Sequence, residues 1–273
     1  MAPDHRTAGR LLLLLAGMAL ALAGCEATDV QPIAPVTELP ATATPSPSPA
    51  GPTSSPSPPT VRMDALKGAS TATAGPGSYR YQVDVPQLEG AGPHARSIDN
   101  VIRGSMQRIV DGFTELARDT PTGTTASQLT CTGRPVRLTP RLAVVRVDCA
   151  QQLAGAGAAD ASTRAFNCDL TGGRVLALQD LFSGGSAYLD VLSAAARTQL
   201  RARLPAGDDR TFDDGTSPVA DNFRTFLLDG KELIVVLPSR YRPIGTAALV
   251  EVTVPYGDLK PYLARTVSDL LGI

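Results

Sequence analysis

The stretch from Ser127 to Gln152, SQLTCTGRPVRLTPRLAVVRVDCAQQ, decides the fold. In its two halves, SQLTCTG and RLAVVRVDCAQQ, apolar and polar residues alternate with a period of two, which is typical of strands with one buried face. The LTPR segment between them contains Pro140, a residue type that is frequent in turns. The stretch therefore predicts an antiparallel hairpin.

Other segments of the chain share this period and predict a sheet of several strands. Further strands are expected at residues 78–88, 162–170, 174–182, 222–228, 232–238 and 248–255, with an Asp229-Gly230 turn in the 222–238 hairpin.

Helical periodicity is clearest over residues 97–117, where apolar residues recur at steps of three and four after Ser97, a plausible cap. Their predicted inward positions are Ile98, Val101, Ile102, Met106, Ile109, Val110, Phe113, Leu116 and Ala117. Helices are also expected at 186–204 and 256–271, and the acidic segment 205–218 is expected to be a loop. Because strands and helices come in runs, we predict one α+β domain with a mainly antiparallel sheet and about three helices.

The first 24 residues have the pattern of a bacterial lipoprotein signal peptide. Arg6 and Arg10 precede an uncharged apolar run, Leu11–Ala23, which is shorter than the roughly 20 residues of a membrane-spanning helix. The run leads into Leu22-Ala23-Gly24-Cys25, which resembles a lipobox, in which the signal is cut before a lipid-modified cysteine. We expect Cys25 to anchor the protein at the extracytoplasmic face of the cell membrane. An ordinary signal peptide with a chance cysteine is the alternative.

A proline-rich segment follows Cys25 and includes ATATPSPSPAGPTSSPSPPT. Such a composition holds too little apolar mass to offset the entropy of ordering, and it favours extended chain. We therefore predict a signal peptide at 1–24, a lipidated, disordered tether at 25–77 and a globular domain at 78–273.

Two segments of the globular region carry a family resemblance. Residues 166–193, FNCDLTGGRVLALQDLFSGGSAYLDVLS, resemble the NYDL-TGK-LTL-DLF segment of the RsiV-like extracytoplasmic domain. Residues 222–263 are similar to the end of that domain, where a D-G hairpin, a Y-x-x-P loop and a V-x-V-P-Y-x-x-L junction follow in order. The domain forms the ectodomain of RsiV-type anti-sigma factors and occurs in mycobacterial secreted immunogenic proteins. The resemblance covers about residues 78–270 and implies ligand capture outside the cytoplasm.

Three cysteines remain after Cys25, and an odd number in an exported protein indicates one disulfide and one buried thiol. If the hairpin turn is centred on Pro140, Cys131 lies opposite Cys149 at bridging distance. A bridge between Cys149 and Cys168, across the next hairpin, is the alternative.

The inventory of reactive side chains favours binding over catalysis. His94 is the one histidine after the signal peptide, and no G-x-S-x-G elbow accompanies it. The cysteine spacing does not match a zinc site, so we expect no metal and no cofactor. A net charge of −1 without basic clusters argues against nucleic acid as a partner.

We therefore expect a non-enzymatic module that binds or senses an envelope or extracellular ligand. An envelope protein, a muramidase and peptidoglycan all remain candidate ligands, and a hydrolase or modifying enzyme of the envelope is the alternative function. Arg240, Tyr241 and Arg242 lie together in a predicted loop, and arginine and tyrosine are enriched at interface hot spots. They are the candidate ligand-binding residues.

Substitution of Cys25 by serine should abolish lipid attachment, because serine lacks the thiol that the acyl-glyceryl group modifies. Metabolic labelling with palmitate should mark the wild-type protein and leave Cys25→Ser unlabelled. Equal labelling of the two proteins would rule out Cys25 as the lipid site.

Overall fold

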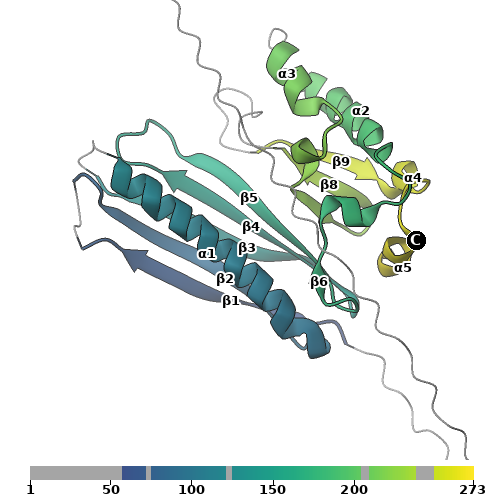
Figure 1. Cartoon of the computed structure of the whole chain (residues 1–273), viewed down its shortest axis with the longest axis horizontal. Coiled ribbons are helices and arrows are strands. Elements are labelled where there is room, and N and C mark those ends of the chain that lie inside the picture. The colour runs from purple at the N-terminus through teal and green to yellow at the C-terminus, as the bar shows by residue number, and fades with distance from the viewer. Residues whose placement is uncertain (1–56, 72–74, 121–124, 204–208, 238–248) are drawn as a thin grey trace, which may run out of the picture. The chain divides into compact units, whose positions relative to one another are not determined.

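The computed structural model describes residues 57–71, 75–120, 125–203, 209–237 and 249–273. Its larger sheet has six strands, which follow one another in chain order (Figure 1). Neighbouring strands are antiparallel except for β2 and β3, which run parallel. The strands are β1 (Thr60–Ala69), β2 (Tyr79–Glu89), β3 (Ser127–Leu138), β4 (Leu142–Gln152), β5 (Asp160–Asp169) and β6 (Arg174–Val175).

Strand β1 corrects the expected start of the domain. The sequence predicted a tether over residues 25–77, but β1 begins at Thr60 and pairs with β2 along its whole length. A Cβ atom on Gly68 would lie 2.4 Å from the ring of Tyr81 on β2. Gly68 therefore leaves room for a side chain of the neighbouring strand.

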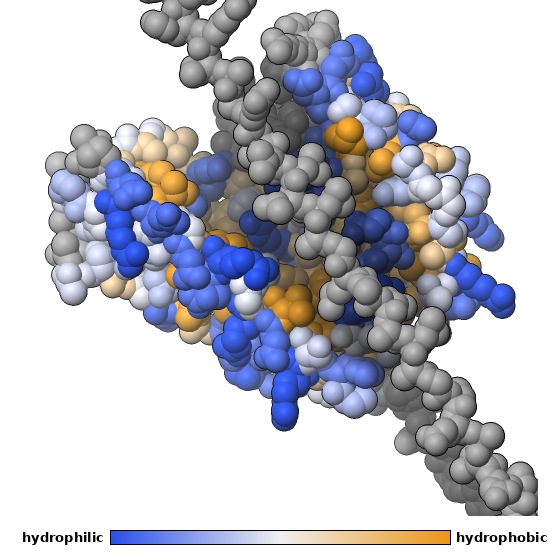
Figure 2. Space-filling view, in the orientation of Figure 1, coloured by the Kyte–Doolittle hydropathy of each residue, from blue (hydrophilic) through white to orange (hydrophobic). Residues whose placement is uncertain are grey.

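Helix α1 (Ala95–Asp119) connects the parallel strands β2 and β3 and lies along one face of the sheet (Figure 1). Val101 and Leu116, which were predicted to face the core, are instead 50% and 52% exposed. Ser97 is not the helix cap, because α1 begins earlier and His94 occupies the cap position without a side-chain hydrogen bond. The buried positions are Ile98, Ile102, Met106, Val110, Phe113 and Ala117, all predicted from the sequence. In Figure 2, which views this face, hydrophilic surface is interrupted by small hydrophobic patches.

The second half of the chain forms a smaller, three-stranded antiparallel sheet with helices around it. Its strands are β7 (Phe226–Leu228), β8 (Glu232–Val236) and β9 (Glu251–Pro255). The helices are α2 (Tyr188–Arg201), α3 (Asp209–Thr216), α4 (Tyr256–Leu259) and α5 (Arg265–Leu271), with 3-10 turns at Gly92–His94, Leu178–Leu181 and Ala220–Phe223. The architecture is α+β, as predicted, with five α-helices in the described part where about three were expected.

Three local predictions in this half were wrong. The strand expected at 174–182 is limited to β6, because the Asp180 carboxylate accepts a hydrogen bond from the Ala177 N–H at 2.8 Å and closes a 3-10 turn. The acidic segment 205–218 contains helix α3, which buries Phe212. The helix expected at 256–271 is divided into α4 and α5, and Pro261 lies between them.

Strand β4 contributes to two hydrophobic cores because both of its faces are covered near its start. Ala143, Val145 and Val147 belong to the core beneath α1, on what we call the helix face of the sheet. Leu142 and Val144 point to the opposite face and belong to the core of the second sheet. The run LAVV, buried at four successive positions, therefore reflects a strand packed on both sides.

A β-bulge at Val136 changes the direction of the side chain that follows it. Next to the turn Leu138 pairs with Ala143 and Arg137 with Val144, whereas Pro135 pairs with Val145, so Val136 is the extra residue. The bulge places Arg137 opposite Val144 and thus on the face of the second sheet. Proline within a strand is tolerated at such irregular positions, and Pro135 is the sequence signal that accompanies the bulge.

The carboxamide of Asn167 joins the two sheets. Asn167 is 1% exposed on β5. Its Nδ2 donates to the carbonyl oxygen of Phe226 at 2.8 Å, and its Oδ1 accepts from the N–H of Leu228 at 2.9 Å. One side chain therefore provides hydrogen-bond partners for two backbone groups of β7 at residues that are buried from water.

Replacing Asn167 by alanine should lower the free energy of unfolding by about 2 to 4 kcal/mol, because it leaves these two buried backbone groups without partners. Urea unfolding followed by circular dichroism measures the loss. Asn100→Ala, at an exposed asparagine of α1, is the matched control and should change the value by less than about 0.5 kcal/mol. Equal losses in the two variants would show that Asn167 does not join the sheets.

Candidate functional site

Two groups of residues singled out by the sequence lie outside the described residues. Cys25, with the signal peptide and residues 26–56, is one of them. The loop residues Arg240, Tyr241 and Arg242 are the other. Near that loop, the N–H of Leu237, the last described residue before it, donates a hydrogen bond of 2.9 Å to the carbonyl oxygen of Val250, the second described residue after it.

The structure contains a disulfide between Cys131 and Cys149, the pairing that the hairpin register predicted. The two residues lie directly opposite each other on β3 and β4 with their Cα atoms 4.0 Å apart. The assumed turn centre was not correct, since the pairs nearest the turn are offset by one residue, but the bulge at Val136 compensates for that offset. The alternative bridge between Cys149 and Cys168 is not formed, because Cys149 faces Ser162 on β5.

Cys168 is a free thiol that is fully buried on β5. Burial, with a smaller contribution from the charge of Asp99, raises the pKa of this thiol to about 12. A thiol with so little thiolate at neutral pH is a poor nucleophile and a poor metal ligand. Cys168 therefore acts as a small core residue.

The remaining polar motifs have structural roles in the described part of the chain. His94 is exposed. The hydroxyl groups of Ser183 and Ser186, just before α2, make no cap hydrogen bond, and Ala187 occupies the cap position. Asp213 forms an ion pair of 3.2 Å with Arg197. No cluster of three or more histidine, cysteine or carboxylate side chains arranged for a metal is found among the described residues.

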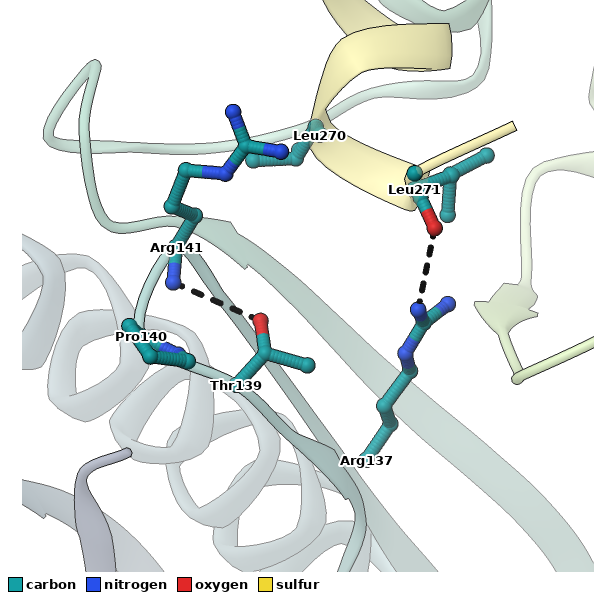
Figure 3. Close-up of a pocket in the computed structure, with 7 residues that line it drawn as sticks. Arg137, Thr139, Pro140, Arg141, Leu270 and Leu271 are labelled. Carbon is teal, nitrogen blue, oxygen red and sulfur yellow. Dashed lines mark hydrogen bonds between the residues drawn. The ribbon is translucent and has the colours of Figure 1, made fainter. Parts of the chain in front are cut away.

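One described pocket, of about 390 Å³, lies between the β3–β4 turn and helix α5 (Figure 3). Its polar wall is formed by Arg137, Thr139 and Arg141. Its apolar wall comes from Pro140, Leu270 and Leu271, with Gly272 at the rim. The pocket thus combines two guanidinium groups with a short hydrophobic surface.

Both arginines of the pocket bind backbone carbonyl groups. Arg137 donates to the carbonyl oxygens of Asp229 at 2.9 Å and Leu271 at 3.2 Å. Arg141 donates to the carbonyl oxygen of Asp269. Cations near the last carbonyls of a helix also interact favourably with its dipole. Because these acceptors are neutral and neither arginine forms an ion pair with a described carboxylate, the pocket keeps a positive charge.

Tyr256 completes the support of this region. Its hydroxyl donates to the Asp229 carbonyl oxygen at 3.0 Å, so Tyr256 and Arg137 share one acceptor. Burial is the largest cause of the raised pKa of the Tyr256 phenol. The phenol therefore stays protonated and serves as a fixed donor that positions the turn after β7.

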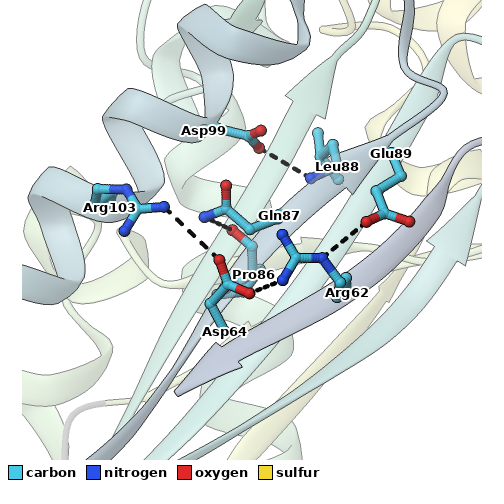
Figure 4. Close-up of polar contacts among 8 residues, drawn as sticks. All are labelled: Arg62, Asp64, Pro86, Gln87, Leu88, Glu89, Asp99 and Arg103. Atoms are coloured by element: carbon cyan, nitrogen blue, oxygen red, sulfur yellow. Dashed lines mark hydrogen bonds and ion pairs between the residues drawn. The ribbon is translucent and has the colours of Figure 1, made fainter. Parts of the chain in front are cut away.

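A second polar cluster lies between α1 and the first two strands (Figure 4). Arg62 on β1 contacts Asp64 and donates to Glu89 at 2.8 Å. Asp64 also lies 3.9 Å from Arg103 of α1. Asp99 accepts a hydrogen bond from the Leu88 N–H at 3.0 Å, while burial raises the pKa of its carboxyl group. The charges of Arg62, Asp64, Glu89 and Arg103 are paired with one another. The cluster therefore connects α1 to the edge of the sheet and does not form a free binding surface.

Comparison with known proteins identifies the fold. No family model matches the chain, and no curated protein matches it. A DUF3298 family protein from Bacteroides fragilis superposes with a TM-score of 0.54 at 13% identity, covering 80% of this chain and 99% of that one. A DUF3298 family protein from Pseudomonas aeruginosa gives 0.53 at 12% identity, covering 78% and 97%. The fold is that of these DUF3298 proteins. DUF3298 domains occur in RsiV-like ectodomains, so the sequence resemblance is supported at the level of the fold.

Within the DUF3298 fold, the residues that carry the sequence resemblance are structural. Asn167 joins the sheets, and the Asp169 carboxylate accepts hydrogen bonds from the N–H groups of Thr171 and Gly172 at 3.0 and 2.8 Å. Gly173 has a φ of +68°, and a Cβ atom there would lie 2.7 Å from the ring of His94. The motif therefore specifies a turn and a junction, and it does not form a ligand site by itself.

The sequence reasoning missed both arginines of this site, Arg141 and Arg137, and Arg137 shows why. Its orientation depends on the bulge, and its acceptors belong to residues about 90 and 130 positions later in the chain. Pro135, beside the bulge, was the available signal. Among the described residues, no helix is both long and apolar enough to cross a membrane.

The disulfide and the buried thiol lead to a test by alkylation. In Cys25→Ser protein without reductant, native Cys168 should react with iodoacetamide at pH 8 far more slowly than after unfolding. The raised pKa alone makes the thiolate roughly a thousandfold rarer, and burial blocks access. Mass spectrometry should find one alkylated cysteine after unfolding in urea, at Cys168. Labelling of Cys131 or Cys149 under these conditions would contradict the observed disulfide.

Proposed function

We propose that this protein is a lipid-anchored module at the extracytoplasmic face of the cell membrane that binds an envelope or extracellular ligand without chemical turnover. The observation that carries the proposal is the pocket between the β3–β4 turn and α5. It offers two cationic donors and an apolar wall, which are features of a binding site.

The chemistry of the pocket favours binding over catalysis. Its lining contains no carboxylate, histidine, cysteine or lysine side chain, the types that usually act as general bases or activated nucleophiles. The Thr139 hydroxyl oxygen accepts hydrogen bonds from the N–H groups of Arg141 and Leu142, at 3.3 and 2.9 Å. The guanidinium groups remain protonated at any physiological pH, so they would contribute charge and direction to a bound group but no proton transfer.

The chemistry of the pocket also suggests the class of ligand. Planar guanidinium groups pair with carboxylate or phosphate groups through parallel hydrogen bonds. The leucine side chains of α5 would contact an apolar portion of the same ligand. We therefore propose a ligand that carries an acidic group beside a hydrophobic one, such as a surface side-chain pair of an envelope protein.

Two features support the proposed location. The segment from Arg6 to Cys25 has the composition of a lipoprotein signal. The disulfide between Cys131 and Cys149 is of a kind that persists in oxidising compartments outside the cytoplasm. The proline-rich segment after Cys25 would hold the domain at a distance from the lipid surface.

Affinity capture from envelope extracts tests the binding function, with mature Cys25→Ser protein as the bait. Arg141→Gln should reduce specific capture by about an order of magnitude, because it removes one of two cations from the pocket. Arg134→Gln, at an exposed arginine of β3, is the matched control and should capture normally. Thermal unfolding of each variant separates loss of binding from loss of folding.

The same baits also address the loop proposed from the sequence. Substitution of Tyr241 and Arg242 by alanine should weaken capture by about tenfold if the loop is a hot spot. Unchanged capture by both the loop variant and Arg141→Gln would show that neither the loop nor the pocket binds the ligand. Turnover of model esters, glycans or peptides by the bait would replace the binding function with the alternative, an envelope hydrolase.

A further inference from the structure

Arg164 lies in the middle of β5 on the helix face of the larger sheet. It pairs in register with Val147 of β4, which is fully buried in the core beneath α1. Residues directly opposite each other share a face of the sheet, so the stem of Arg164 leaves the sheet on the side of α1. The side chain is partly buried. Among the described strands, none pairs with the outer edge of β5 at this position, since β6 joins only at Cys168 and Asp169.

Arg164 has no counter-ion in the described part of the chain. It forms neither an ion pair nor a side-chain hydrogen bond there. Arg146, on the neighbouring strand, shows the contrast. That guanidinium is 11% exposed and is bound by Asp148 at 2.8 Å and by Glu251. Within the described part of the chain, carboxylates therefore neutralise Arg146 but not the partly buried Arg164 on the adjacent strand.

The two described charges that shift the pKa of Arg164 are also cations. Arg224 precedes β7, which the Asn167 carboxamide holds against β5, and Arg108 lies on the exposed side of α1. Burial lowers the pKa of the Arg164 guanidinium, and the charges of Arg224 and Arg108 lower it further. Among these three arginines, only Arg224 forms an ion pair with a described carboxylate, that of Asp221 at 3.1 Å. Both of those side chains are largely exposed.

Two further guanidinium groups beside a partly buried and unpaired one are unfavourable without an anion. Removing a charge from water costs free energy that a partner of opposite charge must offset. Each guanidinium presents several N–H donors in a plane, a geometry that matches the oxygens of carboxylates and phosphates. The alternative to a bound anion is that the aliphatic stem of Arg164 covers Val147 while its guanidinium group is hydrated.

We propose that Arg164, with Arg108 and Arg224, forms an oxyanion-binding site at the outer edge of β5, for a phosphate or carboxylate group. Arg164 lies on the opposite face of the sheet from Arg137, because the bulge turns Arg137 away from α1, and none of the three arginines lines the pocket at α5. The site is therefore independent of the pocket at α5 and does not rest on the function proposed for that pocket.

Isothermal titration of mature Cys25→Ser protein with inorganic phosphate tests the site, at constant ionic strength set with chloride. Arg164→Gln should weaken phosphate binding at least tenfold. Phosphate should also raise the melting temperature of the parent protein and leave that of Arg164→Gln unchanged. Without phosphate, Arg164→Gln should melt at the same temperature or higher, because it removes repulsion among three cations. That outcome also excludes misfolding as the cause of lost binding.

A parallel titration with a short polyglutamate peptide distinguishes the source of the oxyanion. Tighter binding of the peptide than of phosphate would identify acidic chains as the ligand, and the reverse would identify phosphate groups. Arg134→Gln, on the opposite face, is the control and should bind as the parent does. Equal binding by the parent and Arg164→Gln, or no binding of either probe, would overturn the proposal in favour of a hydrated arginine.

Discussion

The carboxamide of Asn167 is the interaction on which the arrangement of the two sheets depends. It supplies a donor to Phe226 and an acceptor to Leu228, so that β7 can end against β5 without unpaired backbone groups. No hydrophobic side chain could do this, because it has neither a donor nor an acceptor for these two backbone groups. The position of Arg224, and thus the cationic cluster at the β5 edge, follows from the same contact.

Strand β4 transmits this arrangement to the rest of the domain. Its first residues alternate between the core beneath α1 and the core of the second sheet, so neither core can shift without the other. The disulfide fixes β4 to β3 further along the strand, and the bulge at Val136 sets the register between the two. The same bulge directs the side chain of Arg137 toward α5. A local irregularity of a strand thus contributes one wall of the pocket.

The arginines of this fold show how one residue type takes different roles according to its partners. Arg146 is paired with carboxylates, and although burial alone lowers its pKa, the hydrogen bonds and charges of Asp148 and Glu251 outweigh that effect and raise it. Arg137 and Arg141 bind neutral carbonyl groups and keep their charge. Arg164 has neither kind of partner among the residues that the structure describes. Positive charge therefore accumulates at two separate places on a chain whose net charge is close to zero.

The sequence by itself determined the elements whose periodicity is strong and local. The buried stripe of α1, the main strands and the Cys131–Cys149 pairing could all be predicted, because alternation and helical spacing record which side chains face a core. Only the tertiary structure decided that β1 is a strand, since it pairs with β2 and its Gly68 leaves room for Tyr81 on that strand. It also decided the roles of Asn167, Arg137 and Arg164, because their partners, or the lack of them, depend on segments far away in the chain.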